Sequence, residues 1–212
     1  MEKQENGKLD YLPERIHVIT VMDYLAKNCT IDQMTVSAIC NAARISRSSF
    51  YNLFDDKYDA ANWYMCRALD LGNRHTGIHY TWYEGNLVTL SGCLIMRNLL
   101  KSAWHSPGYH AMKETGIRVR IQELEDVFAQ RNLEINDEMR YQIEAFAYLE
   151  SKLVRTWVSS DDPMPVETIA AYIVPCVPRD LHNALKDPID PKPCQKLALS
   201  DLVMGIGELA DE

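Results

Sequence analysis

Residues 34–59, MTVSAICNAARISRSSFYNLFDDKYD, contain the pattern that decides the fold. Thr35 stands where a helix N-cap is expected, because its hydroxyl can accept a hydrogen bond from a free amide of the first helical turn. Apolar residues then follow at the 3–4 spacing of a helix with one buried face: Val36, Ile39 and Cys40. After a short turn, Ser46 is in position to cap a second helix. The stretch is therefore predicted to form a helix-turn-helix, whose second helix enters the major groove.

The second predicted helix, at about residues 46–52, turns one face toward the core and the other outward. Phe50 falls on the inner face, whereas Arg47 and Ser48 point outward from the first turns. An arginine in this position can donate two hydrogen bonds to guanine, and a serine can reach a base edge or a phosphate. The alternative interpretation of both residues is an ordinary solvated helix surface.

The same stretch resembles the N-terminal motif of the TetR family of bacterial transcriptional regulators. The residues that carry the resemblance are Thr35, Val36, Ile39, Ala42, Ala43, Ile45, Ser46, Arg47, Phe50, Tyr51, Phe54, Asp56 and Lys57. It implies an all-α fold, in which an N-terminal three-helix helix-turn-helix DNA-binding domain precedes a C-terminal helical domain for ligand binding and dimerisation. Two positions depart from the family pattern, because Arg44 stands where glycine is common and Cys40 where a small residue is usual. A left-handed conformation at Arg44 costs about 1 kcal/mol.

The resemblance also implies further contacts with DNA. Tyr51 and Lys57 are expected to bind phosphates, and Thr35 is expected to add a contact from its cap. Arg44 departs from the family pattern, and its contact is predicted only because an arginine in the turn can reach a phosphate. Each residue has a simpler alternative role, either helix capping or ordinary solvation. The complete predicted DNA-binding set is Thr35, Arg44, Ser46, Arg47, Ser48, Tyr51, Asn52 and Lys57.

Helical periodicity continues through the rest of the chain, without strand alternation, internal repeats or low-complexity segments. Helices are predicted at about residues 13–25, 57–75, 87–104, 109–131, 137–158 and 166–185. Pro175 and Pro178 are expected to interrupt the last of these, because proline lacks a backbone donor. Residues 75–86 are predicted to form a loop or a short turn-rich link. The expected domains are a DNA-binding domain at 1–58, an effector-binding and dimerisation domain at 59–190, and a tail at 191–212.

Aromatic side chains beyond the helix-turn-helix are candidates for an effector pocket, although each also fits the protein core or a dimer interface. The pocket candidates are Trp82, Trp104, Phe128, Tyr141 and Tyr148. The closing helices carry apolar stripes, and the resemblance implies that they form a four-helix bundle with a second copy. The candidate dimer residues are Phe146, Leu149, Leu153, Trp157, Ile169, Ile173 and Val177.

Composition limits the remaining function classes. The chain has 212 residues, of which 47% are hydrophobic, which is enough for a core, and it has no apolar run that would span a membrane. Its six cysteines are widely spaced, so we expect reduced thiols, with a redox-sensing pair as the alternative. No signal-peptide pattern opens the sequence, which indicates a cytoplasmic protein. We expect no metal site, no cofactor and no enzymatic activity, because no ligand cluster or catalytic constellation is evident.

The acidic balance is the main argument against DNA binding. The net charge is −8, and residues 1–60 contain 7 Lys and Arg against 9 Asp and Glu, a net −2. Affinity for phosphate depends on local placement, however, and residues 44–52 contain two arginines and no acid. The sequence therefore predicts a one-component regulator, most simply a repressor, that binds a palindromic operator as a homodimer and is released by a small apolar or aromatic effector. The alternative hypothesis is a helical protein of the same fold that has lost tight DNA binding and acts through protein–protein contacts.

Overall fold

The computed structural model describes residues 12–203, except for the side chains of residues 109–113 and 203. All regular elements in this range are helices, and the one β-type contact in it is an isolated bridge between Thr76 and Tyr80. The all-α fold predicted from the sequence is thereby confirmed. None of these described helices is long and apolar enough to cross a lipid bilayer.

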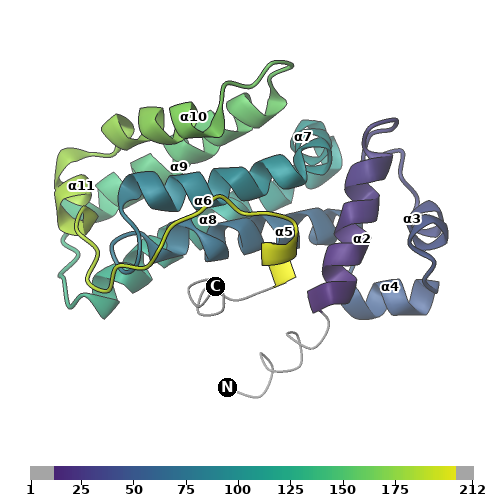
Figure 1. Cartoon of the computed structure of the whole chain (residues 1–212), viewed down its shortest axis with the longest axis horizontal. Coiled ribbons are helices and arrows are strands. Elements are labelled where there is room, and N and C mark those ends of the chain that lie inside the picture. The colour runs from purple at the N-terminus through teal and green to yellow at the C-terminus, as the bar shows by residue number, and fades with distance from the viewer. Residues whose placement is uncertain (1–11, 204–212) are drawn as a thin grey trace. The chain divides into compact units, whose positions relative to one another are not determined.

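The described residues form two compact units, which we treat separately (Figure 1). Unit 1 comprises residues 12–64 and 96–112, and unit 2 comprises residues 65–95 and 113–203. Unit 1 therefore extends beyond the expected boundary at residue 58. It also takes in a later helix, which the sequence pattern assigns to the larger domain.

Unit 1 contains the predicted helix-turn-helix. Its elements are α2 (Leu12–Leu25), α3 (Val36–Ala43), α4 (Arg47–Leu53), the first half of α5 (Lys57–Leu71), α7 (Arg97–His105) and the 3-10 helix η2 (Pro107–Tyr109). Its core combines one buried apolar face from each of the first three helices. Ile16, Ile19 and Met22 of α2 are buried, as are Ile39 of α3 and Phe50 of α4. Burial of these faces fixes the angle at which α3 and α4 present their outer sides.

Of the two aspartates that the sequence offers as the cap of α5, Asp55 and Asp56, the structure uses Asp56, and the helix ends earlier than predicted. Asp56 Oδ1 accepts hydrogen bonds from the amides of Tyr58 at 2.7 Å and Asp59 at 2.8 Å. The helix ends at Leu71 rather than near residue 75. Its end coincides with the close approach of the next residue, Gly72, to α6. A Cβ at Gly72 would lie 2.6 Å from the backbone nitrogen of Thr89, so only glycine fits this close approach.

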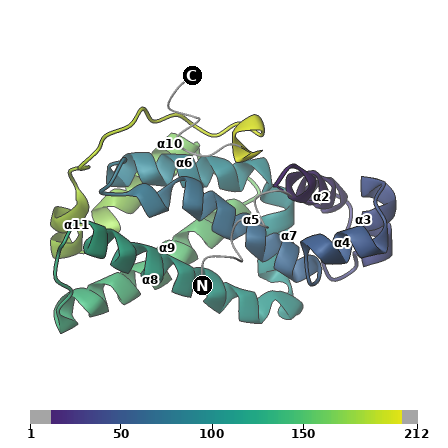
Figure 2. The ribbon, with the colours of Figure 1, turned by 90° about the horizontal axis from the view of Figure 1, so that it is seen from below.

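Unit 2 is a helical bundle, in which α8 and α9 lie side by side (Figure 2) and α10 packs along α6 (Figure 1). Its elements are the second half of α5, η1 (Asn73–His75), α6 (Trp82–Ile95), α8 (His110–Gln130), α9 (Asp137–Ser159), α10 (Val166–Ile173), η3 (Val174–Cys176), α11 (Arg179–Leu185) and η4 (Ser200–Val203). The predicted interruption near Pro175 and Pro178 is present, because α10 gives way to a 3-10 turn and α11 starts after it. The cap of α9 is Asn136, whose Oδ1 accepts from the Met139 amide at 2.8 Å.

The prediction of one helix at 87–104 is wrong in two respects: the helix starts earlier, and it is divided into two helices. α6 begins at Trp82, within the stretch predicted as a loop, because Thr81 and Glu84 form a reciprocal capping box. The Thr81 amide donates to Glu84 Oε2 at 2.8 Å, and the Glu84 amide donates to Thr81 Oγ1 at 3.3 Å. The helix breaks at Met96, whose ψ of 41° is not helical, and α7 starts as a separate helix at Arg97.

The chain after residue 190 is also not a separate tail as far as the structure describes it. Leu197 and Leu202 are buried against unit 2. The Leu197 amide donates to Ser91 Oγ at 2.9 Å, and Arg67 Nε donates to the Leu202 carbonyl at 3.3 Å. Residues 191–203 therefore complete the core of unit 2, and the rest of the predicted 191–212 segment lies outside the described residues.

Candidate nucleic-acid interface

Both helices of the predicted motif begin with the caps that the sequence indicates. Thr35 Oγ1 accepts a hydrogen bond from the Ala38 amide at 3.1 Å, and Ser46 Oγ accepts from the Ser49 amide at 2.9 Å. A cap of this kind contributes roughly 1 kcal/mol. The two cap residues thus fix where α3 and α4 start, whether or not they also touch DNA.

The turn between α3 and α4 has a left-handed residue at Arg44, with φ 57° and ψ 40°. The Ile45 amide donates to the Cys40 carbonyl at 3.0 Å, and the Arg44 amide donates to the Asn41 carbonyl at 3.3 Å. This pair of bonds defines a Schellman motif, in which the left-handed position usually holds glycine. Arg44 therefore carries the strain of a left-handed non-glycine residue. From α2, His17 Nε2 donates to the Ala43 carbonyl at 2.9 Å and ties the turn to the rest of unit 1.

We expect the substitution Arg44→Gly to raise the free energy of unfolding by about 0.5–1 kcal/mol relative to Arg44→Ala, because only glycine takes φ near 57° without a Cβ penalty. Both variants lose the same positive charge, so they should bind DNA equally weakly. Urea unfolding and a DNA-binding titration on the two variants measure these effects. A glycine variant less stable than the alanine variant would contradict the assignment of strain.

The outer face of the motif is polar and carries no acid. Arg47, Ser48 and Tyr51 of α4 are exposed, whereas Phe50 on the opposite side is fully buried. Arg47 Nη1 donates to Ser37 Oγ of α3 at 3.4 Å, which places the guanidinium across both helices. Between residues 34 and 54 the only charged side chains are Arg44 and Arg47. This surface is thus locally positive in a chain whose overall charge is negative.

Lys57 is placed differently from the other predicted contacts. Its Nζ donates to the carbonyls of Asp32 and Met34, each at 2.8 Å, and the side chain is half-buried. The ammonium therefore holds the loop between α2 and α3. The remaining predicted residues are exposed: Thr35, Arg44, Ser46, Arg47, Ser48, Tyr51 and Asn52. A phosphate contact by Lys57 stays a prediction, and the structure gives the residue a second, intramolecular role.

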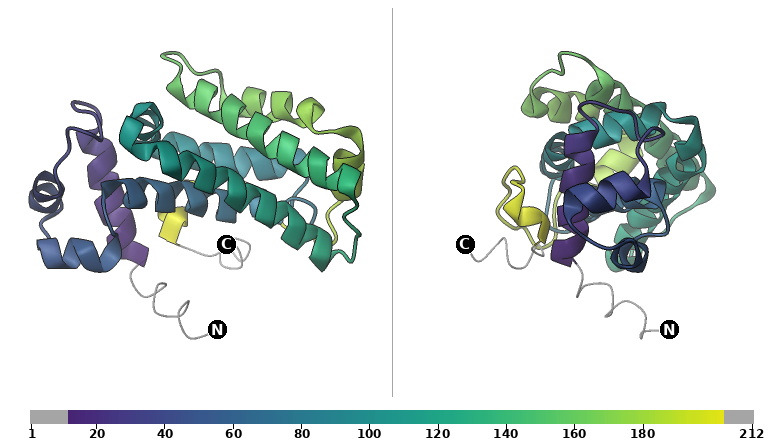
Figure 3. Two further views of the ribbon diagram at one scale, coloured as in Figure 1. Left: turned by 180° about the vertical axis from the view of Figure 1, so that it is seen from behind. Right: turned by 90° about the vertical axis from the view of Figure 1, so that its right-hand side faces the viewer.

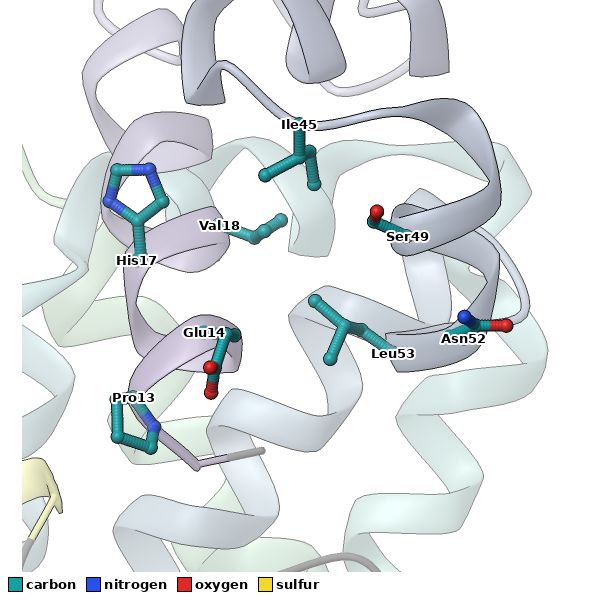
Figure 4. Close-up of a pocket in the computed structure, with 8 residues that line it drawn as sticks. All are labelled: Pro13, Glu14, His17, Val18, Ile45, Ser49, Asn52 and Leu53. Carbon is teal, nitrogen blue, oxygen red and sulfur yellow. The ribbon is translucent and has the colours of Figure 1, made fainter. Parts of the chain in front are cut away.

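A groove of about 470 Å³ runs along the flank of α4 (Figure 4). Pro13, Glu14 and His17 of α2 form one wall of it. Ser49, Asn52 and Leu53 of α4 form the other wall, and Ile45 and Val18 lie between them. Asn52 thus stands at the border between this groove and the outward face of α4, which makes it the least direct of the predicted DNA contacts.

Three residues of unit 1 that take part in this arrangement are not evident from the sequence. Ser37 supports Arg47, and Asp32 and Tyr58 are joined by a hydrogen bond of 2.6 Å from the tyrosine hydroxyl to Asp32 Oδ1. A partial signal precedes Asp32, because Thr30 and Gln33 have the spacing of a capping box. The Thr30 amide donates to Gln33 Oε1 at 2.9 Å, so the loop before α3 is locally ordered.

The candidate effector residues are not brought together. Trp82 and Phe128 are buried in unit 2, and Trp82 packs edge-to-face on Phe146 with ring centroids 5.5 Å apart. Tyr141 and Tyr148 are exposed on α9, at 76% and 52% of their surface. Trp104 belongs to α7 of unit 1. The effector pocket proposed from these five residues stays a prediction.

Most of the candidate dimer residues lie inside the protomer. Phe146, Trp157, Ile169, Ile173 and Val177 are buried within unit 2, so they are not a surface that a second copy can contact. An apolar stripe looks the same in sequence whether it faces the core or a partner, so the pattern alone cannot separate the two. Leu149 is 41% exposed and Leu153 is half-exposed, and both remain interface candidates. The burial of Ile173 also means that a charge placed there would damage the core.

Unit 2 contains a buried charged cluster that the sequence does not reveal. Arg120 Nε donates to Glu150 Oε2 at 2.8 Å, and Arg120 Nη1 lies 3.6 Å from Glu123 Oε2 and donates to the Asn73 carbonyl at 3.1 Å. All four residues are buried. Burial raises the pKa of Glu123 to about 7, although the neighbouring Arg120 acts in the opposite direction. Near neutral pH this carboxyl is therefore balanced between its two protonation states.

The arrangement of helices in the two units is that of a TetR-like regulator fold, as the N-terminal motif predicts. The solved structure of the "Dihydroxyacetone kinase operon activator DhaS" is similar, with a TM-score of 0.60 and 17% sequence identity over 81% of this chain and 96% of that one. No family model and no curated protein matches the sequence. At 17% identity the similarity establishes the fold and not the ligand, the target or the partners.

Proposed function

We propose that this protein is a TetR-family transcriptional regulator that binds double-stranded DNA through α3, the turn and α4. In this proposal α4 lies in the major groove, Arg47 and Ser48 contact base edges, and Tyr51, Arg44 and the N-terminus of α3 contact phosphates. The observation that carries it is the capped α3–turn–α4 unit, whose exposed face has two arginines and no acid between residues 34 and 54.

The proposed DNA-binding form is a homodimer, because one recognition helix contacts too few bases for tight binding. A two-fold dimer would read a palindrome whose half-sites lie about 34 Å apart, or one helical turn. The surface that supports this is a stripe on one side of α9: Tyr141, Ala145, Tyr148, Leu149, Lys152 and Thr156. These residues are exposed on the side of α9 opposite its buried residues. Tyr172 of the neighbouring helix α10 is 60% exposed and adds to the apolar surface.

The direction of regulation has two candidates. The sequence-based hypothesis is a repressor that an effector releases from its operator. The similarity to a protein named as an operon activator makes activation the second candidate. A reporter gene behind the selected operator, measured with and without this protein, separates the two by the sign of the change.

The rival hypothesis is a protein of the same fold that no longer binds DNA tightly. It has support in the acidic balance of residues 1–60 and in Lys57, whose ammonium already bonds two backbone carbonyls. The local absence of acids on the outer face of α3 and α4 favours DNA binding over this rival. The two hypotheses differ sharply in what they predict at low salt.

We expect the protein to enrich a palindromic sequence from a random DNA pool and to lose affinity steeply as salt rises. On that DNA, Arg47→Ala should weaken binding by about 1–3 kcal/mol and relax the preference at one base pair, because it removes a bidentate base contact. Arg179→Ala in the exposed first turn of α11 is the matched control, since it removes an equal charge outside unit 1.

The readout is a fluorescence-anisotropy titration of both variants against operator variants and at several salt concentrations. No enrichment and no binding at low salt would favour the rival hypothesis. Binding by Arg47→Ala that equals the wild type on every operator variant would show that α4 is not the reading helix.

A further inference from the structure

Within unit 1, α7 contacts the α2–α3 segment through a hydrogen bond at each of three successive turns. At its first turn, the Leu99 amide donates to Asp23 Oδ1 at 2.9 Å. One turn later, Ser102 Oγ accepts from the Ile31 amide at 2.6 Å. At its end, Ser106 Oγ donates to Asp32 Oδ1 at 2.5 Å. The helix is thus held along its length by polar contacts to the chain that leads into α3.

Among the residues that form these hydrogen bonds with α7, Asp32 bonds to the largest number of different elements. Its Oδ1 accepts from Ser106 after α7 and also from the Tyr58 hydroxyl at the start of α5, at 2.6 Å. Its backbone carbonyl accepts from Lys57 Nζ at 2.8 Å. Three residues further on, Thr35 caps α3. One side chain therefore connects α5, the end of α7 and the loop that sets the position of the α3 N-terminus.

The contact is not sealed by apolar packing on its open side. A hollow of about 440 Å³ lies beside it, lined mainly by polar side chains of the loop and of α7, among them Gln33, Asn98 and Ser102. The hydrogen bonds from Ser106 and Tyr58 hold the pKa of Asp32 below its usual range, so the carboxylate is charged at neutral pH. With little apolar closure on this side, the hydrogen bonds decide how firmly the loop is held.

We propose that Asp32 is a positioning residue for DNA binding, which holds the loop before α3 against the end of α7 and so sets the position of the α3 N-terminus. This inference rests on the proposed function.

Electrostatics and positioning predict opposite signs for the same substitution. Removal of a negative charge near DNA strengthens binding if charge alone matters. If Asp32 positions the loop, Asp32→Ala instead weakens binding, by about tenfold for the loss of hydrogen bonds to a charged acceptor. Asp55→Ala is the matched control, because Asp55 is an exposed acid before α5 and, among the described residues, no hydrogen bond joins its side chain to α7. Binding by that control should be equal to or tighter than wild type.

The experiment measures the affinity of each variant for the DNA that the wild type enriches from a random pool. Asp32→Asn keeps an acceptor oxygen and should recover most of the affinity, whereas Ser106→Ala and Tyr58→Phe, which change no charge, should each weaken binding. The double variant Asp32→Ala/Ser106→Ala should bind no more weakly than Asp32→Ala alone. Hydrogen exchange of the amides of residues 26–35 should speed up in all the weakened variants while α9 is unchanged.

The inference is overturned if Asp32→Ala binds DNA as tightly as Asp55→Ala does. It is also overturned if Ser106→Ala and Tyr58→Phe bind with the affinity of the wild type. Circular dichroism checks that each variant is folded, and if Asp32→Ala does not fold, the two neutral variants decide. If the wild type binds DNA and these variants bind it with the same affinity, the proposed function stands and only the role of Asp32 is removed. A wild type that binds no DNA overturns both.

Discussion

The variant Leu149→Glu is expected to sediment as a monomer with unchanged helix content and to bind the operator about a hundredfold more weakly. Leu149 lies on the exposed stripe of α9, and α10 with its exposed Tyr172 packs next to this helix (Figure 3). A charge there would be buried without a partner in a two-fold interface, where it would occur twice. Loss of the dimer removes the second reading head, and the gain from linking two heads is about a hundredfold or more.

Leu133→Glu is the matched control for this experiment. Leu133 is 38% exposed, close to the 41% of Leu149, but it lies in the connection between α8 and α9 rather than on the stripe. Analytical ultracentrifugation, circular dichroism and operator titration of the two variants give the comparison. If Leu149→Glu remains dimeric and binds normally, the interface lies elsewhere on unit 2.

The second large effect is expected in stability, from Glu123→Gln. The pKa of Glu123 is raised from 4.5 to about 7 by burial, a difference that corresponds to about 3 kcal/mol. Below pH 4.5 the folded and unfolded states both hold the proton. As pH rises toward 7, the unfolded state releases the proton first, so this group lowers the free energy of unfolding progressively. Above pH 7 the full penalty is present in the wild type and absent in the glutamine variant.

The stability advantage of Glu123→Gln over wild type should therefore grow between pH 4.5 and 7 and then level off. Urea unfolding at a series of pH values measures the difference directly, which cancels the titration of other groups. Glu134→Gln, at an exposed position in the connection after α8, is the control and should show no such growth. A constant difference between Glu123→Gln and wild type over this range would mean that Glu123 is ionised in the folded state throughout.

The helix-turn-helix was the part of the fold most accessible from sequence, because its signals are local. Thr35 and Ser46 cap the helices, and Asp56 caps α5, in each case through an amide two or three residues away. The sequence makes a left-handed Arg44 conditional on the turn geometry, and the structure has this conformation. A capping side chain and the amide that it binds are close in sequence, so a cap can be predicted without knowledge of the tertiary packing.

Contacts between residues far apart in the chain have no such local signal. The partner of Lys57 is a pair of carbonyls about 25 residues earlier, and the partners of Arg120 come from η1 and α9. Periodicity also cannot distinguish an apolar stripe that faces the core from one that faces a second copy, which is why Ile173 was assigned to the interface. The start of α6 at Trp82 is the exception, since the capping box of Thr81 and Glu84 is a local signal.

Unit 1 is discontinuous in sequence, and this has a consequence for the order of events during synthesis. Residues 12–64 leave the ribosome before α7 has been made, so Asp23, the Ile31 amide and Asp32 then have no partner from residues 99–106. Domains generally fold as they emerge, N-terminal parts first. In a nascent chain, the contacts of the helix-turn-helix with α7 can therefore form only after residue 106 has left the ribosome.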